Sequence, residues 1–432
     1  MIERRRFLAA TAGAAALAGC NRNPPAETHT SEPALAGMPL AELRALYRYD
    51  LFDDFLPFLD AHVIDHELGG FMCAADRAGK NINTNKTTWY EGRGIWVYSS
   101  LHNRLAPDPK YLEIARKSVD FILPQRPADD RLWPASFSRG GKPLDSRPGD
   151  IYGGLFVANG LAEYSKAAGN EQYWQTAKEI LRAHLALYDR PGYDYQVAYG
   201  PAIPTFPGPR VLGHWMVLLR LATQMLENAS DRFVEDVTDR CLEAILDRHY
   251  NPAFGLLNEV LHHDLSRPTN GFEQFSYTGH AIETLWMVLF EAARRKDQTL
   301  HDRAAEMFRR HVEIAWDPVY GGFFRSLDHV DRNLWKSDKV LWLQEEVLIG
   351  TLHMVEQTSD PWAREWFGRT YKYVREKYPL KQYGYPLWII GADRKVTFEP
   401  QASRVENFHH PRHLMLNLLA LDRLIERQSK SA

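Results

Sequence analysis

The alternating length of the connections between helices is the feature that most constrains the fold of this chain. Apolar residues recur at helical spacing along most of the 432 residues and predict twelve helices. The links after even-numbered helices are only a few residues long, whereas those after odd-numbered helices run to about 20–30 residues and are rich in turn-forming residues. The predicted helices span residues 41–63, 87–105, 109–124, 150–168, 170–187, 209–228, 230–249, 274–295, 298–315, 337–358, 360–376 and 406–427.

Short links place consecutive helices side by side and antiparallel. Every even-numbered helix therefore begins at the end of the molecule that carries the long loops. Six such hairpins predict an all-α (α/α)6 barrel, a closed toroid that takes up residues 37–430 as a single domain. Loops this long in a compact domain are usually functional, so we expect the active site at their end of the barrel. Short strand-like pieces at 70–75, 255–260 and 322–327 lie inside these loops.

A turn motif occurs twice in the long loops and supports a ring of similar hairpins. The segment Asp65-His-Glu-Leu-Gly-Gly-Phe71 matches Asp317-Pro-Val-Tyr-Gly-Gly-Phe323 at identical spacing. Downstream, Trp89-x-x-x-Arg93 stands within one residue of the place that Trp342-x-x-x-Glu346 takes in the second copy. Internal repeats of this kind are typical of toroids. The glycine pairs are most simply explained as tight β-turns.

The first 20 residues predict an export signal. Arg4-Arg-Arg6 precedes Phe-Leu and an Ala-rich apolar stretch of about 12 residues, which is too short to cross a bilayer. Consecutive arginines before Phe-Leu are typical of twin-arginine signals, and Leu17-Ala-Gly-Cys20 is typical of the lipobox of bacterial lipoproteins. Residues 21–36 then predict a flexible tether. We therefore expect an exported, periplasmic protein that is anchored to the membrane through a lipid on Cys20.

Net charge and residue composition limit the kinds of partner that the chain is expected to bind. The formal net charge is only −3, which argues against a dedicated nucleic-acid binder. The 12 Trp, 20 Tyr and 20 Phe residues either fill the core or stack on the flat faces of a bound ring such as a sugar. Three cysteines are too few for a disulfide framework, and Cys73 and Cys241 are expected to be buried thiols. A second copy of the chain, as a homodimer, is a candidate partner.

Ionisable and polar side chains gather near the starts of the even-numbered helices. His280 and Glu283 are three residues apart and share one helix face, either as a local structural pair or as an imidazole oriented by a carboxylate. Pro411 suits a first helical turn, which leaves His409 near the N-cap, facing the central cavity or capping the helix at the surface. The full set is Arg93, Tyr152, Asn159, His214, His280, Glu283, Glu345, Glu346, His409, His410 and Arg412.

Sequence motifs for metal and nucleotide binding are missing. The chain has 17 histidines but no HExxH, no CxxC pair and no tight His/Asp cluster of the usual metal-site type. The pairs His262-His263, followed by Asp264, and His409-His410 are the weak candidates. No glycine-rich phosphate loop and no persuasive Ser-His-Asp arrangement is present. We therefore expect neither a metal ion nor a redox cofactor.

Five segments in order along the chain carry a resemblance to a known family. They are Trp89-Tyr-Glu-Gly-Arg93 with the preceding Gly69-Gly-Phe71, Arg210-Val-Leu-Gly-His-Trp-Met216, Gly279-His-Ala-Ile-Glu283, Trp342-Leu-Gln-Glu-Glu346 and Phe408-His-His-Pro-Arg412. Together they resemble the N-acylglucosamine 2-epimerases and their cellobiose 2-epimerase relatives. The resemblance implies the (α/α)6 barrel that the helix rhythm also predicts.

The resemblance also implies a reaction. A reducing sugar in its open-chain form has an acidic proton at C2, and its removal and return give an epimer or an aldose–ketose interconversion. His280 and His409 would be the paired acid/base residues, because imidazole titrates near neutral pH. Arg93 would stabilise the developing oxyanion, and Glu283 and Glu346 would orient the histidines or bind hydroxyls. Trp89, Trp96 and Trp342 would line the sugar pocket, with Tyr152, Asn159, His214 and Arg412 completing the substrate site.

Substrate and reaction subtype stay open in the sequence. The segment Tyr277-Thr-Gly-His280 departs from the Asn-Pro-Gly-His of the acylglucosamine branch and is closer to the disaccharide branch, and Val217 stands where related isomerases often carry histidine. Two other functions fit the same barrel. One is a glycoside hydrolase or lyase that uses Glu283 and Glu346 as paired carboxylates. The other is a non-catalytic sugar-binding lipoprotein.

Overall fold

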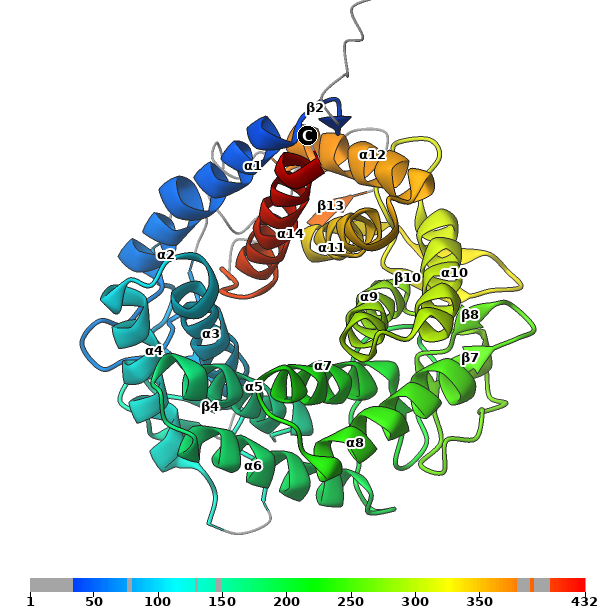
Figure 1. The fold of residues 1–432 in the computed structure, drawn as a ribbon. Coiled ribbons are helices and arrows are strands. Elements are labelled where there is room, and N and C mark those ends of the chain that lie inside the picture. The colour runs from blue at the N-terminus through cyan, green and yellow to red at the C-terminus, as the bar shows by residue number, and fades with distance from the viewer. Residues whose placement is uncertain are drawn as a thin grey trace, which may run out of the picture. The chain divides into compact units, whose positions relative to one another are not determined.

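Two concentric rings of helices form the protein in the computed structural model (Figure 1). The structure describes residues 34–75, 80–128, 131–144, 149–378, 389–391 and 405–431. The predicted signal at 1–20 and most of the tether lie outside these residues. The described residues begin at Ala34, inside the tether expected at 21–36, and β1 (Ala34–Leu35) pairs there with β2 (Met38–Pro39) and buries Leu35. Residues 34–432 cluster as one compact unit.

The inner ring is made of the even-numbered helices of the sequence prediction. Its members are packed on both sides, and residues 341–356 of α11, for example, are almost all buried. From α3 to α14, each inner helix contacts the next one along the chain. The inner helices are α3 (Thr88–Ser100), α5 (Ile151–Ala167), α7 (Leu212–Asn228), α9 (Thr278–Arg295), α11 (Leu341–Thr358) and α14 (His409–Ser431).

The outer ring packs one apolar face inward and turns a polar face to solvent. Most of its helices start with an aspartate whose carboxylate accepts a backbone N–H of the first turn, as Asp231 and Asp297 do for α8 and α10. The outer helices are α1 (Leu40–Tyr49) and α2 (Leu56–His62), α4 (Pro109–Ile122), α6 (Gln172–Tyr188), α8 (Arg232–Glu243), α10 (Gln298–Ala315) and α12 (Pro361–Lys377). Shorter helical turns are Asp50–Phe55, Leu101–Leu105 and Ala244–His249, which are π-helical, and the 3₁₀ turns Leu123–Gln125 and Phe272–Gln274.

The predicted barrel is confirmed. Short links make antiparallel hairpins, and α1 packs against α14, so that the two ends of the domain meet and close the ring (Figure 1). Helices α9, α11 and α14 begin at 278, 341 and 409, a few residues later than the predicted 274, 337 and 406. The missing turn of α11 is extended backbone because β12 (Asp338–Val340) pairs with β13 (Ile389–Gly391). Among the described helices, each is too short or too polar to span a bilayer.

Small antiparallel ribbons brace the long loops. The pieces expected at 255–260 and 322–327 become parts of β8, β9 and β10, whereas 70–75 forms only isolated bridges. β6 pairs with β9 and thereby ties the start of α7 to the loop before α9. The remaining strands are β3 (Lys86–Thr87), β4 (Ser136–Phe137), β5 (Pro143–Leu144), β6 (Arg210–Val211), β7 (Tyr250–Asn251), β8 (Leu256–Leu257), β9 (Val260–Leu261), β10 (Ser326–His329) and β11 (Leu334–Lys336).

The two copies of the turn motif have the same structure. In each, the aspartate follows the end of the preceding helix and binds a buried lysine. A carboxylate oxygen of Asp65 lies 3.0 Å from Nζ of Lys86, and one of Asp317 lies 2.6 Å from Nζ of Lys339. All four glycines of the two motifs have positive φ, as tight turns require. The expected structural role of these residues is confirmed. Cys73 and Cys241 are buried free thiols, also as expected.

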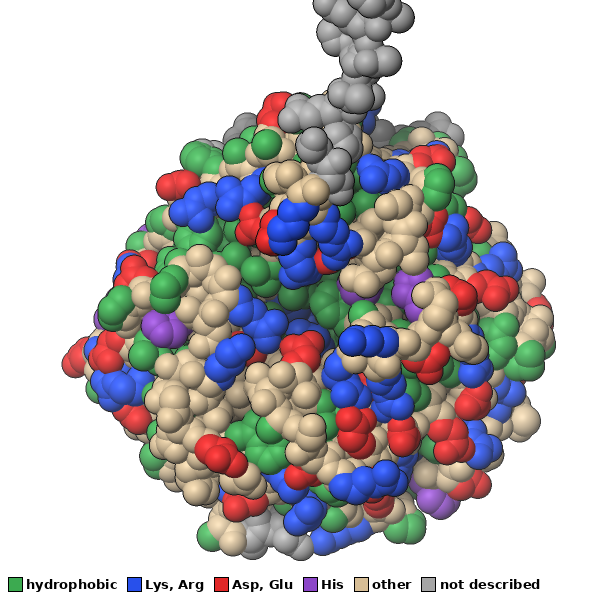
Figure 2. Space-filling view, in the orientation of Figure 1, with side chains coloured by type: hydrophobic (Ala, Val, Ile, Leu, Met, Phe, Trp, Pro, Cys, Tyr) green, Lys and Arg blue, Asp and Glu red, His purple; other side chains and the backbone are tan. Residues whose placement is uncertain are grey.

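The face of the ring seen in Figure 2 carries interspersed basic and acidic side chains, and its centre is hollowed. Ion pairs also join neighbouring helices, as Arg294 on α9 does with Glu235 on α8. The surface charge is thus balanced locally on this face.

Candidate active site

A cavity of about 250 Å³ opens among the starts of the inner helices, at the end of the barrel that carries the long loops. The cavity lies where the sequence predicts the active site. Its walls are mostly aromatic, with Arg, His or Glu side chains from the inner helices α3, α9 and α14 and from the segment before α14. The lining residues are Trp89, Tyr90, Arg93, Tyr152, Phe156, Tyr195, Tyr199, Met216, Val217, His280, Glu283, Trp342, Glu406 and His409.

His280 stands in the first turn of α9 and is held by a carboxylate from another element. Its Nδ1 lies 2.9 Å from Oε1 of Glu259, which immediately precedes β9. The same oxygen accepts a hydrogen bond of 2.6 Å from the Tyr199 hydroxyl. A carboxylate on Nδ1 fixes the ring orientation and leaves Nε2 for the cavity. Glu283, the partner that helix spacing suggested, instead bonds to Arg412.

His409, the first residue of α14, has a parallel arrangement. Its Nδ1 lies 2.9 Å from Oε1 of Glu346 on α11, and its Nε2 lies 3.5 Å from Oε1 of Glu406. The Glu346 carboxylate is itself buried and accepts a hydrogen bond of 2.7 Å from the Trp286 indole. Both cavity histidines therefore have a carboxylate behind the ring. Glu346 takes the orienting position that the resemblance implied for it.

The two imidazoles have opposite electrostatic environments. Burial alone lowers the pKa of His280, but the charge and hydrogen bond of Glu259, with the charge of Glu283, outweigh burial and raise that pKa above its usual value. Burial dominates at His409 and lowers its pKa to about 4, with Arg412 and Arg93 acting in the same direction. Pairs of titratable groups whose surroundings separate their pKa values are typical of acid/base sites.

Arg93 projects from α3 into the cavity and is neutralised there. Its Nη1 donates a 2.7 Å hydrogen bond to Oε1 of Glu406. The guanidinium lies over the rings of Phe156 and Phe408, with its central carbon 4.2 and 4.8 Å from their centroids. Stacking of this kind holds a cation in a largely apolar wall. Arg93 is thus placed to meet negative charge that develops inside the cavity.

A buried ionic network lies directly behind the cavity. Nη2 of Arg412 on α14 donates to Oε1 of Glu283 at 2.7 Å and also to Oε1 of Glu346. Arg412 is only 1% exposed, so its charge must be paired. Arg412 does not line the cavity. The sequence predicted that it contacts substrate, whereas in the structure it holds the two carboxylates behind the cavity.

Trp342 forms the wall between the two histidines. Its ring centroid lies 6.2 Å from that of His280 and 5.4 Å from that of His409. Gly279 permits this approach, because a Cβ at that position would lie 2.5 Å from the indole. Trp89, on the facing side, donates its indole N–H to Asp150 at 3.0 Å. Trp89, Tyr152 and Trp342 all line the cavity, where the sequence placed them.

Three other predicted substrate contacts lie outside the cavity wall. Trp96 is buried and donates its indole N–H to Gln224, and the same Gln224 bonds to the backbone oxygen of Asn159. His214 is fully buried, with ring centroids 4.7 Å from both Tyr152 and Tyr195. Trp96 and Asn159 pack within the barrel, and His214 supports the aromatic wall from behind.

The structure adds site residues that sequence reasoning missed. Glu406 and Tyr199 line the cavity, and Glu259 lies behind His280. All three come from segments between helices. Two faint signals were present: Glu259 follows Asn258 inside an otherwise apolar strand-like stretch, and Glu406 stands three residues before His409. Neither signal predicts which side chain at a helix start the carboxylate of Glu259 or Glu406 contacts.

The paired-carboxylate alternative does not fit this geometry. A glycosidase needs two carboxyl groups on opposite sides of the bond that breaks. Glu283 and Glu346 instead converge on one nitrogen of Arg412, and of the two only Glu283 lines the cavity.

Comparisons with known proteins identify the family of the chain. Residues 69–411 match the family model described as N-acylglucosamine 2-epimerase. The chain is 24% identical to the N-acylglucosamine 2-epimerase of Bos taurus over 385 residues, which cover 87% of this chain and 90% of the relative. The cellobiose 2-epimerase of Spirochaeta thermophila superposes with a TM-score of 0.74 at 18% identity, with 89% of this chain and 98% of that structure covered. A D-mannose isomerase superposes with a TM-score of 0.71 at 14% identity, covering 90% and 99%. The chain therefore belongs to the N-acylglucosamine 2-epimerase family, among the enzymes that epimerise or isomerise carbohydrates.

Proposed function

We propose that this enzyme removes a proton from C2 of an open-chain reducing sugar and returns a proton to C2 or C1, with His280 and His409 as the acid/base pair. The observation that carries the proposal is the pair of imidazoles in one cavity, each with its Nδ1 on a carboxylate. The relatives' names support sugar chemistry at C2. The proposed substrates are a free or N-acylated hexose, or the reducing end of a disaccharide.

The cavity provides the groups that this reaction needs. One imidazole first takes the C2 proton, and the other then gives a proton to C2 from the far side, which inverts C2. The enediolate that forms between the two steps carries negative charge on oxygen. Arg93 lies in the same wall and stabilises that charge, because a fixed cation acts more strongly in a water-poor site than in solution. Trp342, between the two histidines, presents a flat apolar surface to the sugar.

Solvent exchange tests the proposal directly. The purified enzyme is incubated in D2O with glucose, mannose, N-acetylglucosamine, N-acetylmannosamine and cellobiose, and deuterium at C2 and C1 is followed by NMR. We expect deuterium at C2 of at least one sugar, together with its epimer or ketose. The absence of exchange in all reducing sugars tested contradicts the proton-transfer mechanism and favours the sugar-binding alternative.

Replacing a cavity histidine and an exposed histidine by the same residue separates a catalytic role from an effect of losing any histidine. His280→Asn and His409→Asn are each expected to lower the exchange rate by about 10²–10⁴-fold. His263→Asn, at an exposed loop position, is the control and should exchange like the unaltered enzyme. Unaltered exchange in either cavity variant refutes the role assigned to that histidine.

We further propose that the N-terminal segment exports the enzyme and that Cys20 carries the lipid anchor. Support comes from the sequence alone: the arginine cluster, the short apolar stretch and the Leu17-Ala-Gly-Cys20 motif. In cells fed an alkyne fatty acid, the full chain should be labelled and sediment with membranes, and Cys20→Ala should lose both properties. Labelling that persists in Cys20→Ala contradicts the anchor. A homodimer also stays a prediction, which light scattering of the purified enzyme measures.

A further inference from the structure

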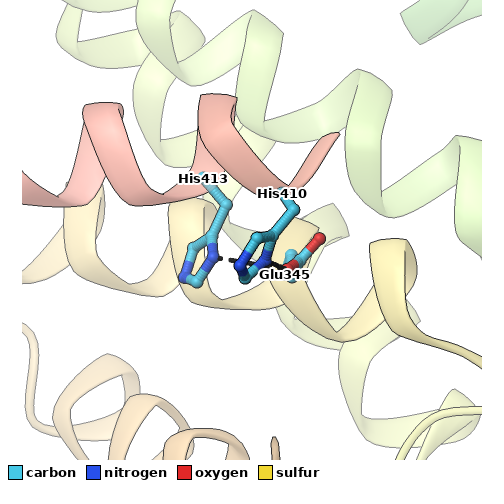
Figure 3. Close-up of side chains that lie close together, drawn as sticks. All are labelled: Glu345, His410 and His413. Atoms are coloured by element: carbon cyan, nitrogen blue, oxygen red, sulfur yellow. Dashed lines mark hydrogen bonds and ion pairs between the residues drawn. The ribbon is translucent and has the colours of Figure 1, made fainter. Parts of the chain in front are cut away.

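We propose that Glu345, His410 and His413 form a binding site for a divalent transition-metal ion such as Zn²⁺, separate from the catalytic cavity. The three side chains meet between α11 and α14 (Figure 3). One ligand atom from each lies within 4.8 Å of the others. Two imidazoles and a carboxylate are donors that Zn²⁺ prefers. The site departs from the sequence-based expectation that the chain binds no metal.

The geometry of the cluster suits one small cation. Nδ1 of His410 contacts Oε1 of Glu345, and Nδ1 of His413 lies 3.6 Å from the same oxygen. Ligands bound to Zn²⁺ at about 2.0–2.1 Å in a tetrahedron lie roughly 3.3 Å apart. The His413 contact already has nearly this separation. The ion would take the place of the proton shared by His410 and Glu345, and that contact would open slightly.

Two buried ligand atoms point to a missing partner. Among the described residues, Oε2 of Glu345 and Nδ1 of His413 make no hydrogen bond. Their residues are only 1% and 4% exposed, so water cannot easily compensate. A buried polar atom without a hydrogen bond costs about 1–3 kcal/mol, and more when it is charged. A cation bound by the Glu345 carboxylate and by Nδ1 of His413 would supply the missing partner.

The second carboxylate cluster of the molecule makes a useful contrast. Glu283, Glu346 and His409 are also close enough to share an ion. There the guanidinium of Arg412 already supplies the cation, through hydrogen bonds to both carboxylates. Within the described part of the chain, the hydrogen-bond and ion-pair partners of Glu345 are the two imidazoles, and Lys or Arg does not reach it.

The surroundings orient the ligands and give access to them. Nε2 of His413 lies 3.1 Å from the Tyr47 hydroxyl, which also accepts a 3.0 Å hydrogen bond from Asn417. Hydrogen bonds on the far nitrogen commonly fix a metal-binding imidazole. The His410 side chain is 17% exposed and, with His413, lines a cavity of about 290 Å³. Asp50 and Asp54 line the same cavity and favour the entry of a cation.

Calorimetric titration of the tag-free, chelator-treated enzyme with Zn²⁺ tests the proposal. We expect one high-affinity site per chain in the unaltered enzyme, and an apparent melting temperature that rises with added Zn²⁺. Glu345→Gln and His413→Gln should each weaken binding by roughly 10- to 100-fold or more and lose the stabilisation. His66→Gln is the matched control, because His66 lies 3.2 Å from Asp60 at the surface and represents adventitious binding.

Either of two results overturns the proposal: no stoichiometric Zn²⁺ binding to the unaltered enzyme, or binding to both cluster variants that equals the control. If a variant fails to fold, crystals of the unaltered enzyme soaked in Zn²⁺ decide the question by anomalous scattering. A peak between the three side chains supports the site, and occupancy only elsewhere refutes it. Because these readouts are independent of turnover, they do not depend on the proposed epimerase reaction.

Discussion

The buried Glu91 gives a sharp prediction about how stability depends on pH. Its Oε1 accepts a 2.9 Å hydrogen bond from the Phe71 backbone, whereas its Oε2 has no partner among the described residues. Burial raises the pKa of Glu91 to about 8, against the opposing effects of that hydrogen bond and of Lys86. In the second copy of the motif the equivalent residue is Gln344, which accepts from the Phe323 backbone at 2.9 Å and donates to its carbonyl at 3.1 Å. The change Glu91→Gln therefore places at position 91 the residue type that already makes these hydrogen bonds in the second copy of the motif.

The sign and size of the effect follow from proton linkage. Because the folded pKa of Glu91 is raised, the folded state holds a proton that the unfolded state releases between about pH 4.5 and 8. This contribution to the free energy of unfolding is fully present below pH 4.5 and is lost as the pH rises through 8. The loss is about 1.4 kcal/mol per pH unit. Between pH 5.5 and 7.5 it amounts to about 2–3 kcal/mol.

Urea unfolding followed by tryptophan fluorescence at pH 5.5, 6.5 and 7.5 measures this loss. The unaltered chain should lose stability relative to Glu91→Gln by the amount given above, and the variant should be the more stable protein at pH 7.5. Gln344→Glu is the mirror control and should acquire the pH dependence that Glu91→Gln removes. Parallel pH profiles for the unaltered chain and Glu91→Gln, or a variant that is less stable at pH 7.5, would refute the reasoning.

Three further predictions rest on single contacts. Glu259→Gln should lower kcat by on the order of 10²-fold, and the loss of its charge should lower the pKa of His280 and move the corresponding limb of the pH–rate profile to lower pH. Arg412→Lys should destabilise the fold by about 3–5 kcal/mol in urea unfolding, because one amine cannot reproduce both buried carboxylate contacts; an unchanged midpoint contradicts this. Gly70→Ala should destabilise more than Gly37→Ala: both have φ near +80°, but a Cβ at Gly70 would lie 2.5 Å from Glu91, whereas Gly37 has open space. Equal melting temperatures would exclude the clash.

Helix periodicity was enough to predict the fold, because most of the barrel is built from helices and from links between helices that are neighbours in the sequence. Each outer helix shows its apolar stripe in the sequence, and each link length fixes whether the next helix is an antiparallel neighbour. The loops were less predictable, since two-residue strands such as β6 and β9 depend on a partner 50 residues away. The late start of α11 has the same cause, because β12 is held extended by a strand that follows α12.

Depth along the helix axis explains why Trp96 and Asn159, which were predicted to contact substrate, do not line the cavity. Trp96 and Asn159 each follow a cavity residue, Trp89 and Tyr152, by seven positions, which keeps them on the same helix face. Seven residues also carry a side chain about 10 Å along the helix axis. At that depth Gln224 bonds to both positions and fills the space. Periodicity gives the face that a residue occupies but not its distance from the mouth of the cavity.

Two pairs of consecutive residues, one on α11 and one on α14, each contribute to two different sites. Consecutive residues on a helix point about 100° apart. On α14, His409 therefore faces the catalytic cavity while His410 faces the outer ring, and on α11 Glu346 and Glu345 divide in the same way. Each histidine meets the glutamate that shares its side, so that the acid/base pair and the proposed metal cluster lie back to back on the same two helices. The sequence shows the doublets but not the pairing, because the pairing depends on how α11 and α14 are rotated against each other in the closed ring.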